Sequence, residues 1–196
     1  MKTYIVIYNQ NSRGKKYKKE ELEKKFIKHD LEAKIFVTKE INEVDQVIKE
    51  FTDSNKYVYI GIGGDGTINS LINSLLNNKI TLPEVACISS GSGSDFLRTF
   101  AMPNNIDEAI LRIKNDKNYL VDTALIQSSN KSNYFINVLN FGFLAETVNL
   151  SEKLPKVFKQ SIIVLGNKYP YSVDQIKSRL FDSENCEIHI VDFCID

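Results

Sequence analysis

The chain has 196 residues and equal numbers of basic and acidic side chains, 25 of each, so its formal net charge at pH 7 is zero. That balance gives no electrostatic argument for a nucleic-acid partner, and we expect none. The three cysteines are an odd number without metal-like spacing, which argues against a disulfide framework and suits a reducing cytosol. No apolar stretch approaches the length of a membrane span, so we expect a cytoplasmic protein, and any contact with lipid would be peripheral, at the inner face of the membrane.

Strands and helices alternate through the first part of the chain. Short apolar runs predict strands at 4–8, 33–37, 57–62 and 84–89, and apolar residues at helical spacing predict helices at 16–28, 41–51, 68–76, 96–100 and 106–113. This alternation predicts an α/β fold, with an open, mainly parallel sheet and helices on both faces. We expect this first domain to cover residues 1–118.

The pattern changes after residue 118. Segments 119–126 and 134–141 are typical of two strands joined by the polar turn 128–133, as in an antiparallel hairpin. A helix is predicted at 172–181 and one more strand at 186–193. The sequence therefore predicts a β-rich second domain at 119–196 that lacks the further strands of a complete sandwich. Such an incomplete sandwich favours pairing with another chain, for example in a homodimer.

The segment 57–67 is the most informative in the chain. Its β-branched and aromatic strand ends in the turn Gly-Gly-Asp-Gly-Thr at 63–67, and an amphipathic helix follows at once. Glycine lets the backbone approach a phosphate, and the first amides of a helix point at it. A carboxylate beside phosphate indicates a cation between them, so Asp65 predicts Mg²⁺, bound directly or through water. The alternative is a tight turn with Asp65 or Thr67 as helix N-cap.

A second loop of small residues, 89–95, also follows a predicted strand and leads into an apolar helical segment. Ligands of open α/β sheets bind at the carboxyl ends of the strands, and both loops fall there.

Elsewhere, segment 13–28 carries eight basic residues against three acidic ones. That run is either the solvated face of a helix or a surface that meets phosphate or an anionic bilayer.

Three motifs together resemble the diacylglycerol kinase catalytic domain family, which includes bacterial lipid kinases and sphingosine kinases. They are the runs Gly63–Asn69, Gly91–Phe96 and Phe135–Val138, the last followed by Gly142-Phe143. NAD kinases and phosphofructokinases carry turns similar to the first motif, and the other two favour the lipid-kinase branch. The resemblance implies a nucleotide-binding domain followed by a β-sandwich, with ATP in the cleft between them and transfer of its γ-phosphoryl group to a lipid hydroxyl such as that of diacylglycerol.

The resemblance also implies roles for individual residues. Asp65 and Asp95 would be the catalytic residues, with Asp65 holding Mg²⁺ through water and Asp95 near the acceptor. The nucleotide-binding set would be Asn9, Ser12, Thr38, Gly63, Gly64, Asp65, Gly66, Thr67, Asn69, Gly91 and Ser92.

The chain departs from the family pattern at four residues. Gln10 stands where the family has proline, Arg13 where it usually has glycine, Ser92 replaces a threonine and Ser94 an asparagine. Family members also continue beyond the equivalent of Asp196 and bring an Asp-Gly-Glu segment, with the candidate general base, back to the site. Two alternatives to a lipid kinase therefore stay open: a truncated, catalytically inactive nucleotide-binding module, and a kinase of a soluble substrate similar to NAD kinase.

Overall fold

A computed structural model describes residues 2–12, 16–90, 95–115, 118–128, 131–136 and 187–195. Its contacts divide the chain into two compact units, the first made of 1–125, 133–136 and 189–196, and the second of 126–132 and 137–188. The first unit holds almost all the described residues. The domain boundary predicted after residue 118 stays a prediction.

Four neighbouring parallel strands form one side of the sheet. They are β1 (Thr3–Asn9), β2 (Ala33–Thr38), β3 (Tyr57–Gly63) and β4 (Glu84–Ser89). β1 pairs with both β2 and β3, and β3 pairs with β4, in every case parallel. The other strands are β5 (Tyr119–Ser128), β6 (Lys131–Phe135) and β7 (Glu187–Ile195), and the full order is β2-β1-β3-β4-β7-β5-β6. The predicted strands β1 to β4 are confirmed.

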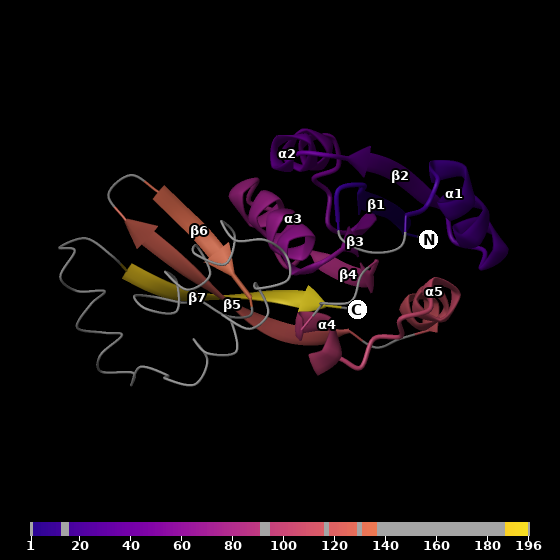
Figure 1. Ribbon diagram of the computed structural model, residues 1–196. Coiled ribbons are helices and arrows are strands. Elements are labelled where there is room, and N and C mark those ends of the chain that lie inside the picture. Colours follow the sequence, from indigo (N-terminus) through magenta and orange to yellow (C-terminus); the bar gives the residue numbers. More distant parts are fainter. Residues whose placement is uncertain are drawn as a thin grey trace, which may run out of the picture. The chain divides into compact units, whose positions relative to one another are not determined.

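Helices cover both faces of the parallel strands, as the alternation predicted (Figure 1). They are α1 (Lys19–Lys28), α2 (Ile41–Glu50), α3 (Asp65–Asn77), α4 (Asp95–Thr99) and α5 (Ile106–Asn115). α1 begins three residues later than predicted because the backbone of Tyr17 bonds β1 instead of a helical turn. The Tyr17 N–H donates to the hydroxyl of Tyr8 at 2.9 Å. None of the described helices combines the length and apolar character needed to cross a membrane.

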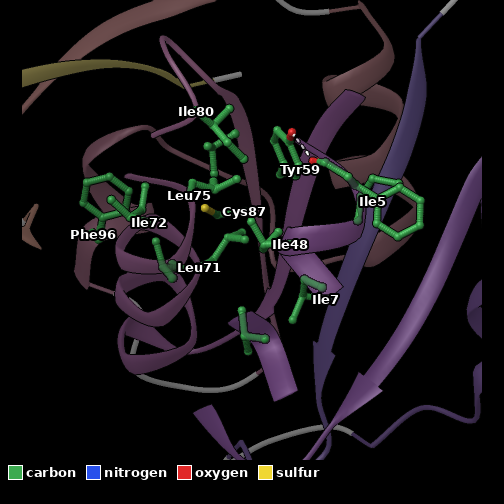
Figure 2. Packing of buried hydrophobic residues seen from close by; sticks show 14 of the residues in the cluster. Ile5, Ile7, Ile48, Tyr59, Leu71, Ile72, Leu75, Ile80, Cys87 and Phe96 are labelled. Atoms are coloured by element: carbon green, nitrogen blue, oxygen red, sulfur yellow. Dashed lines mark hydrogen bonds between the residues drawn. The ribbon is translucent and has the colours of Figure 1, made fainter. Parts of the chain in front are cut away.

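Successive strand residues point to opposite faces of the sheet, so two separate cores form. On β1, Ile5 and Ile7 pack with α2, α3 and α4, whereas Val6 and Tyr8 pack with α1 and α5. Figure 2 shows the first core, in which Leu71 and Leu75 of α3 lie beside Cys87 of β4. The near-continuous apolar strands of this chain are what a sheet buried on both sides requires.

On each face of the sheet, one carboxylate joins two of the helices. Between α2 and α3, Asp45 accepts hydrogen bonds from Ser74 at 3.1 Å and Asn78 at 2.7 Å. Between α1 and α5, Asp107 lies 2.6 Å from Lys25 and 3.3 Å from both Lys28 and His29. Part of the basic run at 13–28 is therefore paired with acid inside the fold.

The hairpin prediction needs correction. β6 covers Lys131–Phe135, so the strand predicted to start at residue 134 begins three residues earlier. Ser132 and Asn133 are exposed and polar, so no apolar alternation marks this strand in the sequence. β7 covers 187–195, close to the predicted 186–193. The rest of the second predicted strand, the helix at 172–181 and most of the implied sandwich lie outside the described residues.

Candidate functional site

The loops that follow the four parallel strands meet at the carboxyl edge of the sheet. Asn9 and Thr38 are the last residues of β1 and β2, and beside them lie Ser12 after β1, the glycine-rich turn after β3 and Ser90 after β4. Backbone bonds tie these loops together: Gln10 N–H donates to the Thr38 carbonyl at 3.0 Å, and Ser90 N–H to the Gly63 carbonyl at 3.2 Å. Residues distant in the sequence are thereby placed in one site, where open α/β sheets bind ligands.

The glycine-rich turn leads directly into α3. Gly64 is the N-cap in an extended conformation, with no side chain capping the helix, and α3 begins at Asp65. The amides of Thr67 and Ile68 both donate to the Gly64 carbonyl, at 2.9 and 3.2 Å. The alternative that Asp65 or Thr67 serves as N-cap is therefore wrong. The helical hydrogen bonds of α3 start at Thr67, and a helix N-terminus placed directly after a strand is a general site for binding anions.

Glycine stands at the three positions of the turn for different physical reasons. A Cβ on Gly63 would lie 2.2 Å from Oγ1 of Thr67, so only glycine fits beneath that side chain. A Cβ on Gly64 or Gly66 would meet nothing within 4 Å. Gly63 is therefore required by packing, whereas the backbone at Gly64 and Gly66 is open to a ligand. The sequence assigned all three to phosphate binding and could not separate these reasons.

Thr67 joins the start of α3 to the end of β1. It is buried, and its Oγ1 accepts a hydrogen bond of 3.0 Å from the side-chain amide of Asn9. The other end of that amide, Oδ1 of Asn9, accepts the Asn11 backbone N–H at 2.9 Å. Two residues of the predicted site are thus brought into contact, and the Asn9 side chain fixes the course of the loop after β1.

A pair of serine hydroxyls joins the loop after β1 to the loop after β4. Oγ of Ser12 lies 2.7 Å from Oγ of Ser90. The ammonium group of Lys16 holds the same loop by donating to the backbone carbonyls of Gln10 and Ser12. Sequence reasoning found Ser12 but missed Ser90, which is one of many small residues in its loop, and Lys16, which is one of many lysines in the basic run.

Asp65 connects α3 with α4. One carboxylate oxygen, Oδ1, accepts the backbone N–H of Phe96 at 3.3 Å. Burial, and to a smaller extent the charge of Asp65, raise the pKa of the Cys87 thiol to about 12, so this thiol stays protonated and unreactive. No group of three His, Cys, Asp or Glu side chains able to hold a metal exists among the described residues. A single carboxylate such as that of Asp65 is chemically compatible with Mg²⁺, which usually keeps several waters and takes one or two carboxylates together with the phosphates of a substrate.

The remaining predicted residues are placed less directly. Thr38 is 3% exposed, and its hydroxyl points to the Tyr8 carbonyl at 3.5 Å. Asn69 lies exposed on α3, where its backbone carbonyl accepts a bond of 2.9 Å from Asn73. Asp95 is the first residue of α4, and its side chain lies outside the description, as do Gly91 and Ser92.

Asn73 is a further polar residue of α3 that the sequence did not single out. Its side-chain amide pairs with the backbone of Tyr134 in both directions, each bond being 2.8 Å. The side chain thus acts as a short strand partner, which satisfies the backbone of β6 where it meets α3.

Comparison with known proteins agrees with the motifs. The family model of the diacylglycerol kinase catalytic domain matches residues 3–126. A diacylglycerol kinase of Staphylococcus aureus strain JH9 is 31% identical over 144 residues, which are 72% of this chain and 44% of that protein. The diacylglycerol kinase of strain Newman aligns with the same figures.

A solved structure agrees as well. The crystal structure of a diacylglycerol kinase from Bacillus anthracis str. Sterne superposes with a TM-score of 0.54 at 26% sequence identity, covering 68% of this chain and 48% of that one. The chain thus spans less than half the length of these relatives.

Proposed function

The chain belongs to the diacylglycerol kinase catalytic domain family, and from that membership we propose that it binds Mg·ATP at the carboxyl edge of its sheet and serves transfer of the γ-phosphoryl group to a lipid hydroxyl. Diacylglycerol is the acceptor named for the relatives, and it is the first acceptor to test. The observation that carries the proposal is that hydrogen bonds hold the loops after β1 and β4 and the glycine-rich turn together at the carboxyl edge of the sheet, where Asp65 begins α3.

Phosphoryl transfer asks a protein for positioning and charge neutralisation more than for covalent chemistry. The open backbone at Gly64 and Gly66 would receive the phosphates, with the first amides of α3 directed at them. The hydroxyl of Ser12 would donate to a phosphate oxygen. Mg²⁺, when bound, would neutralise phosphate charge, and Asp65 would hold it through water.

The acceptor side of the site is proposed from family membership. Asp95, at the start of α4, would lie near the lipid headgroup. The exposed lysines Lys18, Lys19 and Lys24 of the basic run would face the anionic surface of the inner membrane leaflet, with peripheral contact only. We further propose a cytoplasmic location, a β-rich second domain from residue 119 and association as a homodimer.

Two variants of Asp65 test the nucleotide site. Asp65→Asn keeps an oxygen that can accept the Phe96 amide but removes the charge, whereas Asp65→Ala removes both. Because the charge organises the cation, we expect both variants to weaken Mg·ATP binding by about tenfold or more, and only Asp65→Ala to loosen α4 as well. Titration calorimetry with and without Mg²⁺, and hydrogen exchange at the Phe96 amide, measure the two effects.

The matched control is Asp53→Ala. Asp53 is also a carboxylate beside β3, but it lies before the strand, where it pairs with Lys56 at 3.1 Å. Its removal changes the net charge equally and should leave Mg·ATP affinity unchanged. Equal losses in Asp53→Ala and Asp65→Ala, or Asp65→Asn binding like the unchanged chain, would contradict the proposed cation role.

Transfer is then tested with labelled γ-phosphate and three acceptors: diacylglycerol, a total lipid extract and NAD. Labelled lipid that disappears in Asp65→Asn supports the lipid kinase. Transfer of the label to NAD would instead support a kinase of a soluble substrate. Mg²⁺-dependent binding without transfer to any acceptor would identify this chain as a nucleotide-binding module.

A further inference from the structure

The serine pair at the carboxyl edge has a feature that the proposed function does not use. Ser12 is half-buried, whereas Ser90 behind it is only 4% exposed. Their oxygens are 2.7 Å apart, a normal distance for a hydrogen bond between hydroxyls. The distance alone allows either hydroxyl to be the donor, so burial has to decide.

The Ser90 hydroxyl has one proton to donate. Within the described part of the chain, Ser12 Oγ is the only hydrogen-bond partner of this side chain. A buried donor without an acceptor costs free energy, and the depth of Ser90 keeps bulk water away. The favourable arrangement therefore has Ser90 donating to Ser12. The proton of Ser12 is then left for a group on the open side of the loop.

From this geometry we propose that Ser90 is a positioning residue for the nucleotide site: its hydroxyl donates to Ser12 and so directs the Ser12 proton to a phosphate oxygen of the ligand. An anion accepts hydrogen bonds and donates none, so it selects the same direction along the pair. A hydroxyl that already accepts one bond is polarised and donates the next more strongly.

Two backbone contacts keep the pair in place. The Ser90 N–H is bound to the Gly63 carbonyl at 3.2 Å, so Ser90 is fixed to the glycine-rich turn. The Ser12 carbonyl is held by the ammonium group of Lys16. The direction of the Ser12 hydroxyl is thus set before a ligand arrives, which lowers the ordering cost of binding.

This inference rests on the proposed function, because Ser12 is taken to contact phosphate. The experiment is a double-mutant cycle in the 196-residue chain, with Ser12→Ala, Ser90→Ala and the double variant, and titration with Mg·ATP. Ser90→Ala should weaken binding by about three- to tenfold, which is the size of effect expected when the hydrogen bond from Ser90 to Ser12 is lost. In the Ser12→Ala background the same change should have almost no further effect.

Three further variants keep the test decisive. Ser90→Cys keeps the shape of the side chain with a slightly larger atom but donates only weakly, so it should bind like Ser90→Ala even if the latter unfolds early. Ser90→Thr keeps the hydroxyl and should restore most of the affinity. Ser70→Ala is the matched control: the Ser70 hydroxyl donates to the carbonyl of Gly66 one turn before it in α3, and this variant should bind Mg·ATP as the unchanged chain does.

The outcomes separate this inference from the proposed function. If the unchanged chain fails to bind Mg·ATP, the proposed function fails and the pair has no nucleotide to serve. If the unchanged chain binds and the losses in Ser12→Ala and Ser90→Ala simply add, or Ser90→Cys binds normally, the positioning role is overturned. A lowered melting temperature with unchanged affinity would make Ser90 a structural residue only.

Discussion

The two edges of the parallel sheet satisfy their polar groups in different ways. At the amino edge, opposite charges and buried rings close the structure: Lys2 pairs with Glu84, and the Tyr59 hydroxyl donates to the Phe51 carbonyl at 2.6 Å. At the carboxyl edge, uncharged side chains bond one another across loops, as Asn9 does with Thr67 and Ser12 with Ser90.

This difference separates residues that stabilise the fold from residues that remain available to a ligand. Neutral hydrogen bonds between loops contribute little net stability, and a ligand's oxygens can replace or extend them. The hydrogen bonds and aromatic rings buried at the amino edge are not accessible to a ligand. Substitutions at the amino edge should therefore change the free energy of unfolding, and those at the carboxyl edge should change affinity.

The largest expected effect breaks this rule within the glycine-rich turn. Gly63→Ala places a methyl group 2.2 Å from Thr67 Oγ1, so the start of α3 must move. We expect the free energy of unfolding to fall by about 3 kcal/mol, the upper range for overpacking a tight site. Gly64→Ala, one residue on, meets open space and should cost well under 1 kcal/mol. Urea unfolding of both variants measures the difference.

A larger side chain at Gly64 should lower affinity rather than stability. Gly64→Val keeps the fold but puts a branched side chain in the open space proposed for phosphate, so Mg·ATP binding should weaken more than it does in Thr67→Val. Stability losses of similar size at Gly63 and Gly64 would mean that the two glycines do not differ in packing. Normal binding by Gly64→Val would remove the phosphate from this part of the backbone.

At the amino edge, Tyr59→Phe should change stability alone. Tyr59 is fully buried, and the dashed line in Figure 2 marks its hydroxyl bond to Phe51 at the end of α2. Burial raises the pKa of Tyr59, so the hydroxyl stays a proton donor at all ordinary pH values. Its loss leaves the Phe51 carbonyl unsatisfied, at a cost of about 2 kcal/mol. The melting temperature should fall while Mg·ATP affinity stays unchanged, and an affinity loss would show that the edges are coupled.

Most of the fold follows from local patterns in the sequence. β1, β3 and β4 are apolar on both faces, which marks them as buried strands regardless of their neighbours. The start of β6 was missed because the exposed polar residues Ser132 and Asn133 show no such pattern. Tertiary contacts define this strand, including the bonds from Asn73 to Tyr134. The start of α3 was predicted at residue 68 because the polar residues of its first turn conceal the helix.

The site was predictable as a set of loops but not as a set of contacts. The family resemblance suggested Asn9 and Ser12. The glycine-rich turn after a predicted strand suggested the segment that contains Thr67, because glycine and small polar residues after strands are a local signal. Ser90 carries no such signal. It meets Ser12 only because the sheet places β1 and β4 on either side of β3, and strand order is a property of the whole chain.

The smallest expected effect concerns the carboxylate that joins α1 and α5, away from the proposed ligands. Hydrogen bonds from Lys25, His29 and Lys28, opposed by partial burial, lower the pKa of Asp107 from 3.8 to about 2. A carboxyl group with a lowered pKa in the folded state stabilises the protein above its unfolded pKa, near 4, and loses that contribution as the pH falls toward about 2.

Asp107→Asn should therefore lower the free energy of unfolding by about 1 kcal/mol at pH 6, after allowance for solvent screening of this partly exposed group. The difference from the unchanged chain should shrink below pH 4 and vanish near pH 2, which urea unfolding at several pH values would measure. Mg·ATP affinity at pH 7 should be the same in both proteins. A stability difference that did not depend on pH would assign the loss to packing of the side chain, because only its charge titrates over this interval.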